Sequence, residues 1–230
     1  MERHGLIVVT VAMAEGAVAW WAPIGLLRYP IAWCAVATAA CGIAMTLGVV
    51  SLLGKRRDGS MPLWSPLIWW PWHLATRVSA AAGRLRGEPY TEVAPGWYIG
   101  GWPETPELFD DWPAVVDTTC ELPRRVPDDV PYLNLPTWDG TAPTQDAIAQ
   151  GAAWATKQRE AGPVLVHCTH GHSRSATVLA AALLMSAEAD TWQDALAVIR
   201  RSRKRAHLTG SQRAALARWA EGFSARPSPR

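Results

Sequence analysis

The segment VLVHCTHGHSRSATVLAAALLMS, residues 164–186, predicts a strand, a tight turn and a helix in immediate succession. Residues 164–167 are apolar and mostly β-branched, which is typical of a strand buried on both faces. Residues 175–186 are almost wholly Ala, Leu, Val and Met, and this composition indicates a buried helix. A turn that joins a strand to the start of a helix favours an anion, because backbone N–H groups point into it and the helix dipole adds positive potential.

Three residues of this turn suit it to phosphate chemistry. Gly171 permits a backbone angle that a Cβ would forbid, and the planar fork of Arg174 can hold two oxygens of a phosphoryl group. Cys168 opens the turn, where the N–H groups and the guanidinium would lower the pKa of its thiol below the free value of about 8.5. A thiolate at the base of a phosphate cradle is placed for in-line attack on phosphorus.

The pattern His-Cys-x-x-Gly-x-x-Arg-Ser at residues 167–175 resembles the signature of the cysteine-dependent protein tyrosine phosphatase superfamily, in its compact dual-specificity branch. Residues 93–101 are similar to the entry strand of that branch, and residues 117–121 to its second strand and exit. The resemblance therefore extends over most of residues 93–223. It implies a phosphoric monoester hydrolase that works through a phosphocysteine and needs neither a metal nor a cofactor.

The resemblance also implies a role for each position of the signature. Cys168 attacks phosphorus, the hydroxyl of Ser175 stabilises the thiolate when it leaves, and His167 orients the loop without carrying a proton. Backbone N–H groups of the turn and the guanidinium of Arg174 bind the phosphoryl group. The substrate-binding set is Thr169, His170, Gly171, His172, Ser173 and Arg174.

Asp139 is the general acid that the resemblance implies. In this branch the acid lies on a loop after a strand and before a helix, and Asp139 stands 29 residues before Cys168 in the stretch TWDGTAP, residues 137–143. Asp-Gly is also a common turn pair, so a plain turn residue is the alternative. The competing carboxylates are Asp117, Asp128, Asp129 and Asp146.

Each of three further features has two interpretations. His170 and His172 become cationic at mildly acidic pH and help to hold a polyanionic headgroup, or they are ordinary rim residues. Cys120 forms a protective disulfide with Cys168, or it is a structural cysteine at a strand end. The basic run at residues 200–205 is a solvated helix end, or it attracts anionic lipid or substrate.

The first 57 residues predict two membrane-spanning helices. Residues 5–27 contain one charged residue, Glu15, and residues 30–54 contain none, so each run reaches the ~20 residues that a membrane-spanning helix needs. Residues 28–30 break the two runs, and Lys55 with its two arginine neighbours follows the second. By the positive-inside tendency both ends lie in the cytoplasm. A cleaved signal peptide and a buried hairpin of a soluble protein are the alternatives.

The rest of the chain divides by composition. Residues 58–87 form a Trp- and Arg-rich juxtamembrane linker, whose Trp side chains lie at the lipid headgroups or pack on the following domain. Residues 88–225 are long enough for a single domain, and residues 226–230 form a tail. The net charge of +2 is too small to suggest a nucleic-acid binder.

The catalytic part predicts an α/β three-layer sandwich with a mostly parallel central sheet, because strand and helix patterns alternate. We expect strands at residues 96–100, 114–118, 132–135 and 164–167. Helices are expected at residues 107–112, 144–160, 175–186, 191–203 and 211–223.

Together these features predict a membrane-anchored phosphatase with its catalytic domain in the cytoplasm. The leading substrates are proteins phosphorylated on tyrosine, serine or threonine. Phospholipid headgroups, such as phosphatidylglycerophosphate or a phosphoinositide, are the alternative substrates. A non-catalytic module that binds phosphorylated partners is the second alternative.

Overall fold

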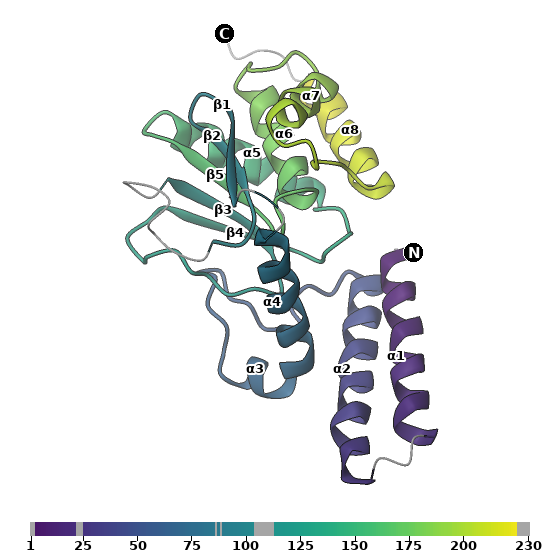
Figure 1. Cartoon of the computed structure of the whole chain (residues 1–230). Helices are drawn as coiled ribbons and strands as arrows, with labels where there is room; N and C mark the ends of the chain where they lie inside the picture. The colour runs from purple at the N-terminus through teal and green to yellow at the C-terminus, as the bar shows by residue number, and fades with distance from the viewer. Residues whose placement is uncertain (1–2, 22–24, 86, 88, 104–112, 225–230) are drawn as a thin grey trace.

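A computed structural model of the chain describes residues 3–21, 25–85, 87, 89–103 and 113–224. Its centre is a five-stranded sheet in the order β1-β2-β5-β3-β4 (Figure 1). The strands are β1 (Tyr90–Ala94), β2 (Trp97–Gly100), β3 (Ala114–Thr119), β4 (Tyr132–Thr137) and β5 (Val164–His167). Four of them run parallel, and β1 pairs antiparallel with β2 at the edge. The prediction of a mostly parallel sheet is confirmed, whereas β1 was not predicted as a separate strand.

Helices α5 (Gln145–Arg159), α6 (Arg174–Met185), α7 (Trp192–Ser202) and α8 (Gly210–Ser224) share one hydrophobic core with the sheet. On the other face, Val115 and Leu165 pack with Val126 and Tyr132, close to the connection between β3 and β4. Within the described residues, helices α5–α8 therefore cover one face of the sheet, and the third layer of the expected sandwich stays a prediction. The helix expected at residues 107–112 and the tail at 226–230 lie outside the described residues.

The predicted helix starts are accurate where a cap is visible in the sequence. Thr144 accepts a hydrogen bond from the N–H of Ala147 at 3.1 Å, and Thr191 accepts one from Asp194 at 3.1 Å. Such caps satisfy backbone N–H groups that have no partner inside the helix. Both helices consequently begin directly after these threonines.

The N-terminal hairpin consists of α1 (Arg3–Trp21), a short 3-10 helix (Gly25–Leu27) and α2 (Arg28–Leu47). Both helices are long and apolar enough to cross a membrane, and only 17% and 28% of their apolar windows are buried. The expected boundaries are wrong in two places. The turn precedes Arg28, and α2 begins at Arg28. Pro30 lies in the first turn of this helix, where proline is tolerated. The second helix ends at Leu47, since Gly48 adopts φ 71° and caps it.

The linker folds as two helices, α3 (Trp64–Ile68) and α4 (Trp70–Arg84), and α4 leads from α3 back to the sheet (Figure 1). Trp69 and Trp72 pack inward, as one of the two interpretations expected. The indole N–H of Trp33 donates to the carbonyl of Ile68 at 3.0 Å, so α3 lies against the first half of α2. Large apolar side chains on this pair are nevertheless exposed, namely Leu63, Leu67, Leu74 and Val78.

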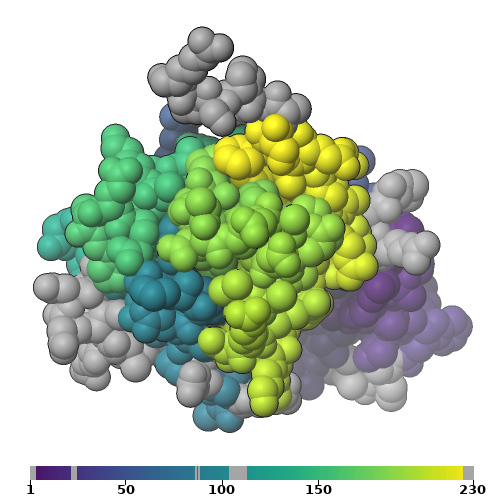
Figure 2. Space-filling model, turned by 90° about the horizontal axis from the view of Figure 1, so that it is seen from above, coloured from purple at the N-terminus to yellow at the C-terminus, as the bar shows by residue number. Residues whose placement is uncertain are grey.

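Seen from above, the C-terminal helices α6 to α8 (green to yellow) cover the near side of the molecule (Figure 2). The hairpin (purple) protrudes beyond them at one side. The apolar surfaces of the hairpin and of α3–α4 are thus separate from the core of the catalytic domain.

Lys55 connects the hairpin to the sheet. The sequence indicated a charged cytoplasmic flank, but the structure buries this side chain completely. Its Nζ lies 2.6 Å from Asp117 Oδ2 and 2.8 Å from the carbonyl of Thr119. Burial alone would raise the pKa of the Asp117 carboxyl, but Lys55 and His167 bring that pKa below its ordinary value. The ion pair is a fixed contact between the segment after α2 and the centre of the sheet.

We predict that Lys55→Met destabilises the fold by about 3–5 kcal/mol, because it leaves the buried Asp117 carboxylate without its cation. Arg57→Met, at an exposed position two residues away, is the control and is expected to change little. The measurement is a denaturant titration of the full chain in detergent micelles. Equal stability of the two variants would contradict a structural role for the ion pair.

Candidate active site

The loop of residues 168–173 joins the end of β5 to the start of α6. Gly171 adopts φ +71°, and a Cβ at this position would collide with the backbone of Gly100. The loop is fixed against the end of β2, because Cys168 N–H donates to the Gly100 carbonyl at 3.3 Å and Trp102 N–H donates to the Thr169 carbonyl at 3.2 Å. The structure thus has a tight cradle with a helix N-terminus at its base.

Cys168 lies at the bottom of this cradle and is buried. Its Sγ accepts the N–H of Gly171 at 3.2 Å and the hydroxyl of Ser175 at 3.4 Å. Burial alone would raise the pKa of the thiol, but the Arg174 guanidinium and the hydrogen bonds from Ser175 outweigh it. The pKa of Cys168 is therefore lowered, which favours the nucleophilic thiolate.

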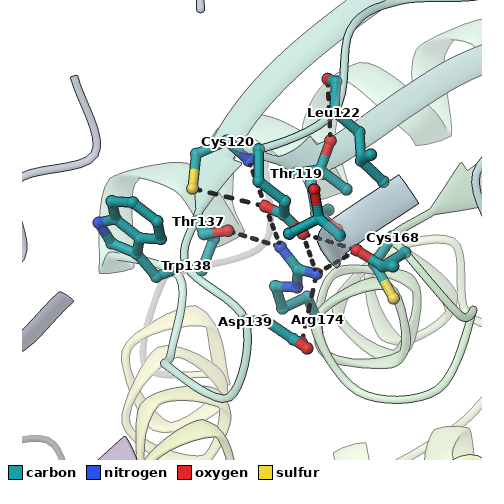
Figure 3. Close-up of polar contacts among 12 residues, drawn as sticks. Thr119, Cys120, Leu122, Thr137, Trp138, Asp139, Cys168 and Arg174 are labelled. Atoms are coloured by element: carbon teal, nitrogen blue, oxygen red, sulfur yellow. Dashed lines mark hydrogen bonds and ion pairs between the residues drawn. The ribbon is translucent and has the colours of Figure 1, made fainter. Parts of the chain in front are cut away.

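Arg174 is fully buried, and its guanidinium joins several loops (Figure 3). Its two terminal nitrogens donate to Glu121 Oε1 at 2.7 Å and Oε2 at 3.0 Å, a bidentate pair. They also donate to the carbonyl of Thr137 and the hydroxyl of Thr169, each at 2.7 Å. The guanidinium is consequently held in one orientation before any substrate binds.

Glu121 is the functional residue that sequence reasoning missed. Burial would raise the pKa of its carboxyl, but the guanidinium of Arg174 lowers it to about 2, so the carboxylate stays charged. One signal pointed to it: Glu121 follows β3, which pairs with β5, and the carboxyl ends of parallel strands meet at one edge of a sheet.

Asp139 lies beside the cradle, with Oδ1 3.2 Å from the terminal nitrogen of Arg174. Its side chain is 57% exposed and lines the cavity above Cys168. The competing carboxylates lie elsewhere: Asp117 is paired with Lys55, Asp146 lies in the first turn of α5, and residues 128–129 form an exposed turn. The structure thus brings Asp139, and not its competitors, to the cavity.

His167 precedes the nucleophile and is buried behind the loop. Its Nε2 lies 3.7 Å from Asp117 Oδ2, and its Nδ1 lies 3.4 Å from the carbonyl of Cys168. Burial lowers the pKa of this imidazole, which stays neutral at physiological pH. Its contacts are those of a residue that supports the loop.

The rim of the cradle carries stacked histidines. The rings of His170 and His172 lie 6.0 Å apart at 16°, and His170 Nε2 lies 3.2 Å from the hydroxyl of Ser79 on α4. Burial, followed by the charge of Arg203, lowers the pKa of His172 to about 4. For His172 the lowered pKa favours the interpretation as an ordinary rim residue over that as a cation at mildly acidic pH. Arg203, from the basic run, donates to the His170 carbonyl at 3.0 Å and braces the loop.

Cys120 is buried and not disulfide-bonded, as are Cys41 and Cys168. Its Sγ lies 3.5 Å from Glu121 Oε2. Burial and the nearby Glu121 carboxylate raise the pKa of the Cys120 thiol well above its ordinary value, so this cysteine remains protonated. These contacts are those of a structural cysteine at a strand end.

A cavity of about 490 Å³ opens over Cys168. The cradle and Asp139 form one side of it. The opposite side is formed by segments outside the catalytic loops: Ile7 and Val8 of α1, Met45 of α2, and Trp72 and Ala75 of α4. The cavity thus has a phosphate-binding floor and a largely apolar wall. Within the described residues, no group of three or more metal-ligating side chains is arranged to hold a metal.

Comparison with known proteins agrees with this geometry. Residues 115–221 match the family described as dual specificity phosphatase, catalytic domain. A mouse putative dual specificity phosphatase, solved with zinc tungstate, shares 25% identity over 60% of this chain and 91% of its own, with a TM-score of 0.54. Tk-PTP in its active form shares 28% identity over 58% and 97% of the two chains, with a TM-score of 0.53.

PTPMT1 shares 26% identity over 60% of this chain and 97% of its own, with a TM-score of 0.52. The curated proteins gave no match. Residues 115–221 form a catalytic domain of the protein tyrosine phosphatase superfamily. More narrowly, it is a dual-specificity phosphatase domain, and the chain is a phosphoric monoester hydrolase of this type.

We predict that Ser175→Ala moves the alkylation of Cys168 to higher pH, because it removes a hydrogen bond that lowers the pKa of the thiol. The measurement is the rate of iodoacetamide modification of Cys168 against pH, followed by peptide mass spectrometry. Inorganic phosphate should slow the reaction in the unmodified chain by occupying the cradle. An unchanged pH midpoint in the variant would contradict this role of Ser175.

Proposed function

We propose that this chain is a membrane-anchored phosphatase that hydrolyses the phosphomonoester of a bilayer lipid through a phosphocysteine intermediate. The observation that carries the proposal is the composition of the cavity over Cys168, whose wall is supplied by α1, α2 and α4. Phosphorylated proteins, the leading expectation from the sequence, are the competing substrate class.

The proposed reaction has two steps. In the first, the thiolate of Cys168 forms a bond to phosphorus while the bond to the ester oxygen breaks, and the carboxyl of Asp139 gives its proton to the departing oxygen. In the second, the Asp139 carboxylate takes a proton from water, which attacks phosphorus and releases the thiolate. The hydroxyl of Ser175, 3.4 Å from the sulfur, stabilises that thiolate.

Arg174 and the backbone N–H groups of residues 169–174 bind the equatorial oxygens in this mechanism. Their preorganisation is supported by the bidentate bond between Arg174 and Glu121, which fixes the guanidinium. Fixed donors stabilise the transition state because they need no reorientation during the reaction. The cradle thus supplies the positive field at the transferred group.

Membrane anchoring is supported by the lengths and hydropathy of α1 and α2 and by the small share of each that is buried. A soluble hairpin would bury one face of each helix, because exposed apolar surface of this extent is unfavourable in water. The exposed apolar side chains of α3–α4, beside α2, extend the same surface. We propose a two-helix anchor with the catalytic domain in the cytoplasm.

A lipid substrate is supported by the position of the cavity. His4, Ile7 and Val8 belong to the first turns of α1, and Met45 belongs to the last turns of α2, so the wall is formed at the proposed cytoplasmic ends of the membrane helices. A phosphorylated headgroup at the membrane surface could reach Cys168 while its apolar part stays near the hairpin. Binding of a phosphoprotein does not require an apolar wall beside the phosphate site.

The test uses the full chain in mixed micelles. We predict faster turnover of phosphatidylinositol phosphate or phosphatidylglycerophosphate than of peptides carrying phosphotyrosine, phosphoserine or phosphothreonine. The phosphoinositide probe is chosen because PTPMT1 was solved in complex with PI(5)P. Cys168→Ser should abolish phosphate release from every substrate. Faster turnover of peptides would overturn the lipid proposal, and activity in Cys168→Ser would overturn the mechanism.

A matched pair of α1 variants tests the apolar wall. Ile7→Ser, in the wall, should lower kcat/KM for the lipid about tenfold, because this side chain is 60% exposed and a bound lipid would cover it. The variant should leave a small aryl phosphate unaffected. Leu6→Ser is the control, because Leu6 is also exposed but does not line the cavity. Equal effects of the two substitutions would argue against lipid contact with the wall.

The pH dependence of kcat/KM tests the pairing of thiolate and acid. We predict a bell-shaped profile with an acidic optimum, because the active form needs an ionised Cys168 and a protonated Asp139. Asp139→Asn should flatten the falling limb. A rate that rises monotonically above neutral pH in the unmodified chain would contradict the pairing.

A further inference from the structure

We propose that Trp138 is a positioning residue through which the hairpin holds the general acid loop in place. The inference rests on the proposed role of Asp139 and concerns what keeps that carboxyl over the cradle. It assigns the hairpin a second task besides anchoring, because most of the side chains packed around Trp138 come from segments that precede the catalytic domain.

Trp138 directly precedes Asp139 and is 1% exposed. Its indole packs in a cluster with Cys41 and Met45 of α2 and Leu53 of the following turn. Its Nε1–H donates to the carbonyl of Val49 at 3.1 Å, across 89 positions of sequence. These four partners precede residue 115, where the match to the catalytic domain begins, and the cluster also contains Cys120 from within that domain.

Helix α4 closes this cluster from another direction. The rings of Trp72 and Trp138 meet edge to face, with centroids 6.0 Å apart, a favourable geometry for aromatic pairs. Trp138 is therefore enclosed by the end of α2, the turn after it, and α4. Its position depends on how these membrane-proximal segments sit on the domain.

The residue after the acid contacts the hairpin as well. Gly140 adopts φ +77°, and a Cβ placed on it would lie 2.7 Å from the ring of His4 in α1. A side chain at position 140 would therefore require the ring of His4 to move. Asp139 therefore lies between two residues, Trp138 and Gly140, that both contact the hairpin or its extension.

The loop transmits the position of Trp138 to Asp139 because it is short and internally bonded. The N–H and hydroxyl of Thr141 both donate to the carbonyl of Trp138, at 3.2 Å and 2.9 Å. On the other side, the amide of Gln212 donates to the carbonyl of Thr141 at 2.8 Å. Figure 3 shows the result: the indole of Trp138 points away from Arg174, and the carboxyl of Asp139 points toward it.

A leaving-group comparison separates this role from a merely structural one. p-Nitrophenyl phosphate releases a weakly basic phenolate that needs little protonation, whereas phenyl phosphate and alkyl phosphates need the acid. Weakening the contacts that hold Trp138 should therefore selectively reduce the turnover of esters with poorer leaving groups. A general acid contributes roughly 10²–10⁴-fold, so partial misplacement should cost about tenfold.

The experiment measures kcat for p-nitrophenyl and phenyl phosphate with the full chain in detergent micelles. Trp138→Phe and Leu53→Ala should each lower kcat for phenyl phosphate about tenfold and leave kcat for p-nitrophenyl phosphate within about threefold. Leu53 is buried in the cluster around Trp138 and does not line the cavity. Leu63→Ala is the matched control, because it makes the same substitution at a side chain that is 85% exposed. Asp139→Asn sets the upper limit of the leaving-group effect.

The outcomes distinguish this inference from the proposed function. If Asp139→Asn is selective for phenyl phosphate but Trp138→Phe and Leu53→Ala lower the two rates equally, the positioning role of Trp138 is wrong and the acid role stands. If Asp139→Asn itself shows no selectivity, the assignment of the acid fails and the positioning role fails with it. If Leu53→Ala does not fold, Trp138→Phe, which keeps an aromatic ring at this position, decides the question.

Discussion

The buried guanidinium of Arg174 is the interaction on which the active site depends. It has no contact with solvent, and it contacts the exit of β3 through Glu121, the end of β4 through the Thr137 carbonyl, and the cradle through Thr169. A buried cation is costly unless it is paired, so each of these partners is required to keep it in place. The same guanidinium lowers the pKa of Cys168 and lies 3.2 Å from Asp139. One side chain therefore links the nucleophile, the phosphate site and the acid loop.

The hairpin and the catalytic domain are joined by non-covalent contacts in addition to the peptide chain. Lys55 reaches the centre of the sheet at Asp117, next to His167 and so to the strand that leads into the cradle. Trp138, on the loop that carries Asp139, packs into the cluster at the end of α2 and donates a hydrogen bond to Val49. The apolar wall of the cavity is a third connection. These contacts make the hairpin and the helices after it part of the candidate site, which agrees with the proposed lipid substrate.

The cradle was predictable because its determinants are contiguous. Strand, glycine turn and helix follow one another within residues 164–186, and backbone geometry alone produces the anion site. Helices α5 and α7 were predictable for a similar reason, since Thr144 and Thr191 act on residues three positions away. The antiparallel edge strand β1 was not, because its residues are only partly buried and show weak alternation.

The remaining determinants act over long sequence separations. Glu121 and Arg174 are 53 positions apart, and Lys55 and Asp117 are 62 apart, so no local pattern pairs them. Lys55 also carries the sequence signal of a membrane flank, which concealed its burial. The depressed pKa of His172 likewise arises from its burial and from Arg203, which is distant in sequence. The sequence thus predicted the geometry of the loop, whereas the distant groups that hold it in place became visible only in the structure.

The transfer of phosphate to the sulfur of Cys168 can be observed directly. The full chain is mixed with a phosphomonoester in detergent micelles, quenched in acid after one turnover, and its intact mass and peptides are measured. We predict an added phosphoryl group on Cys168 that forms before inorganic phosphate appears and then decays. Release of phosphate with no adduct on Cys168 at any time, or an equal rate from Cys168→Ser, would contradict the mechanism.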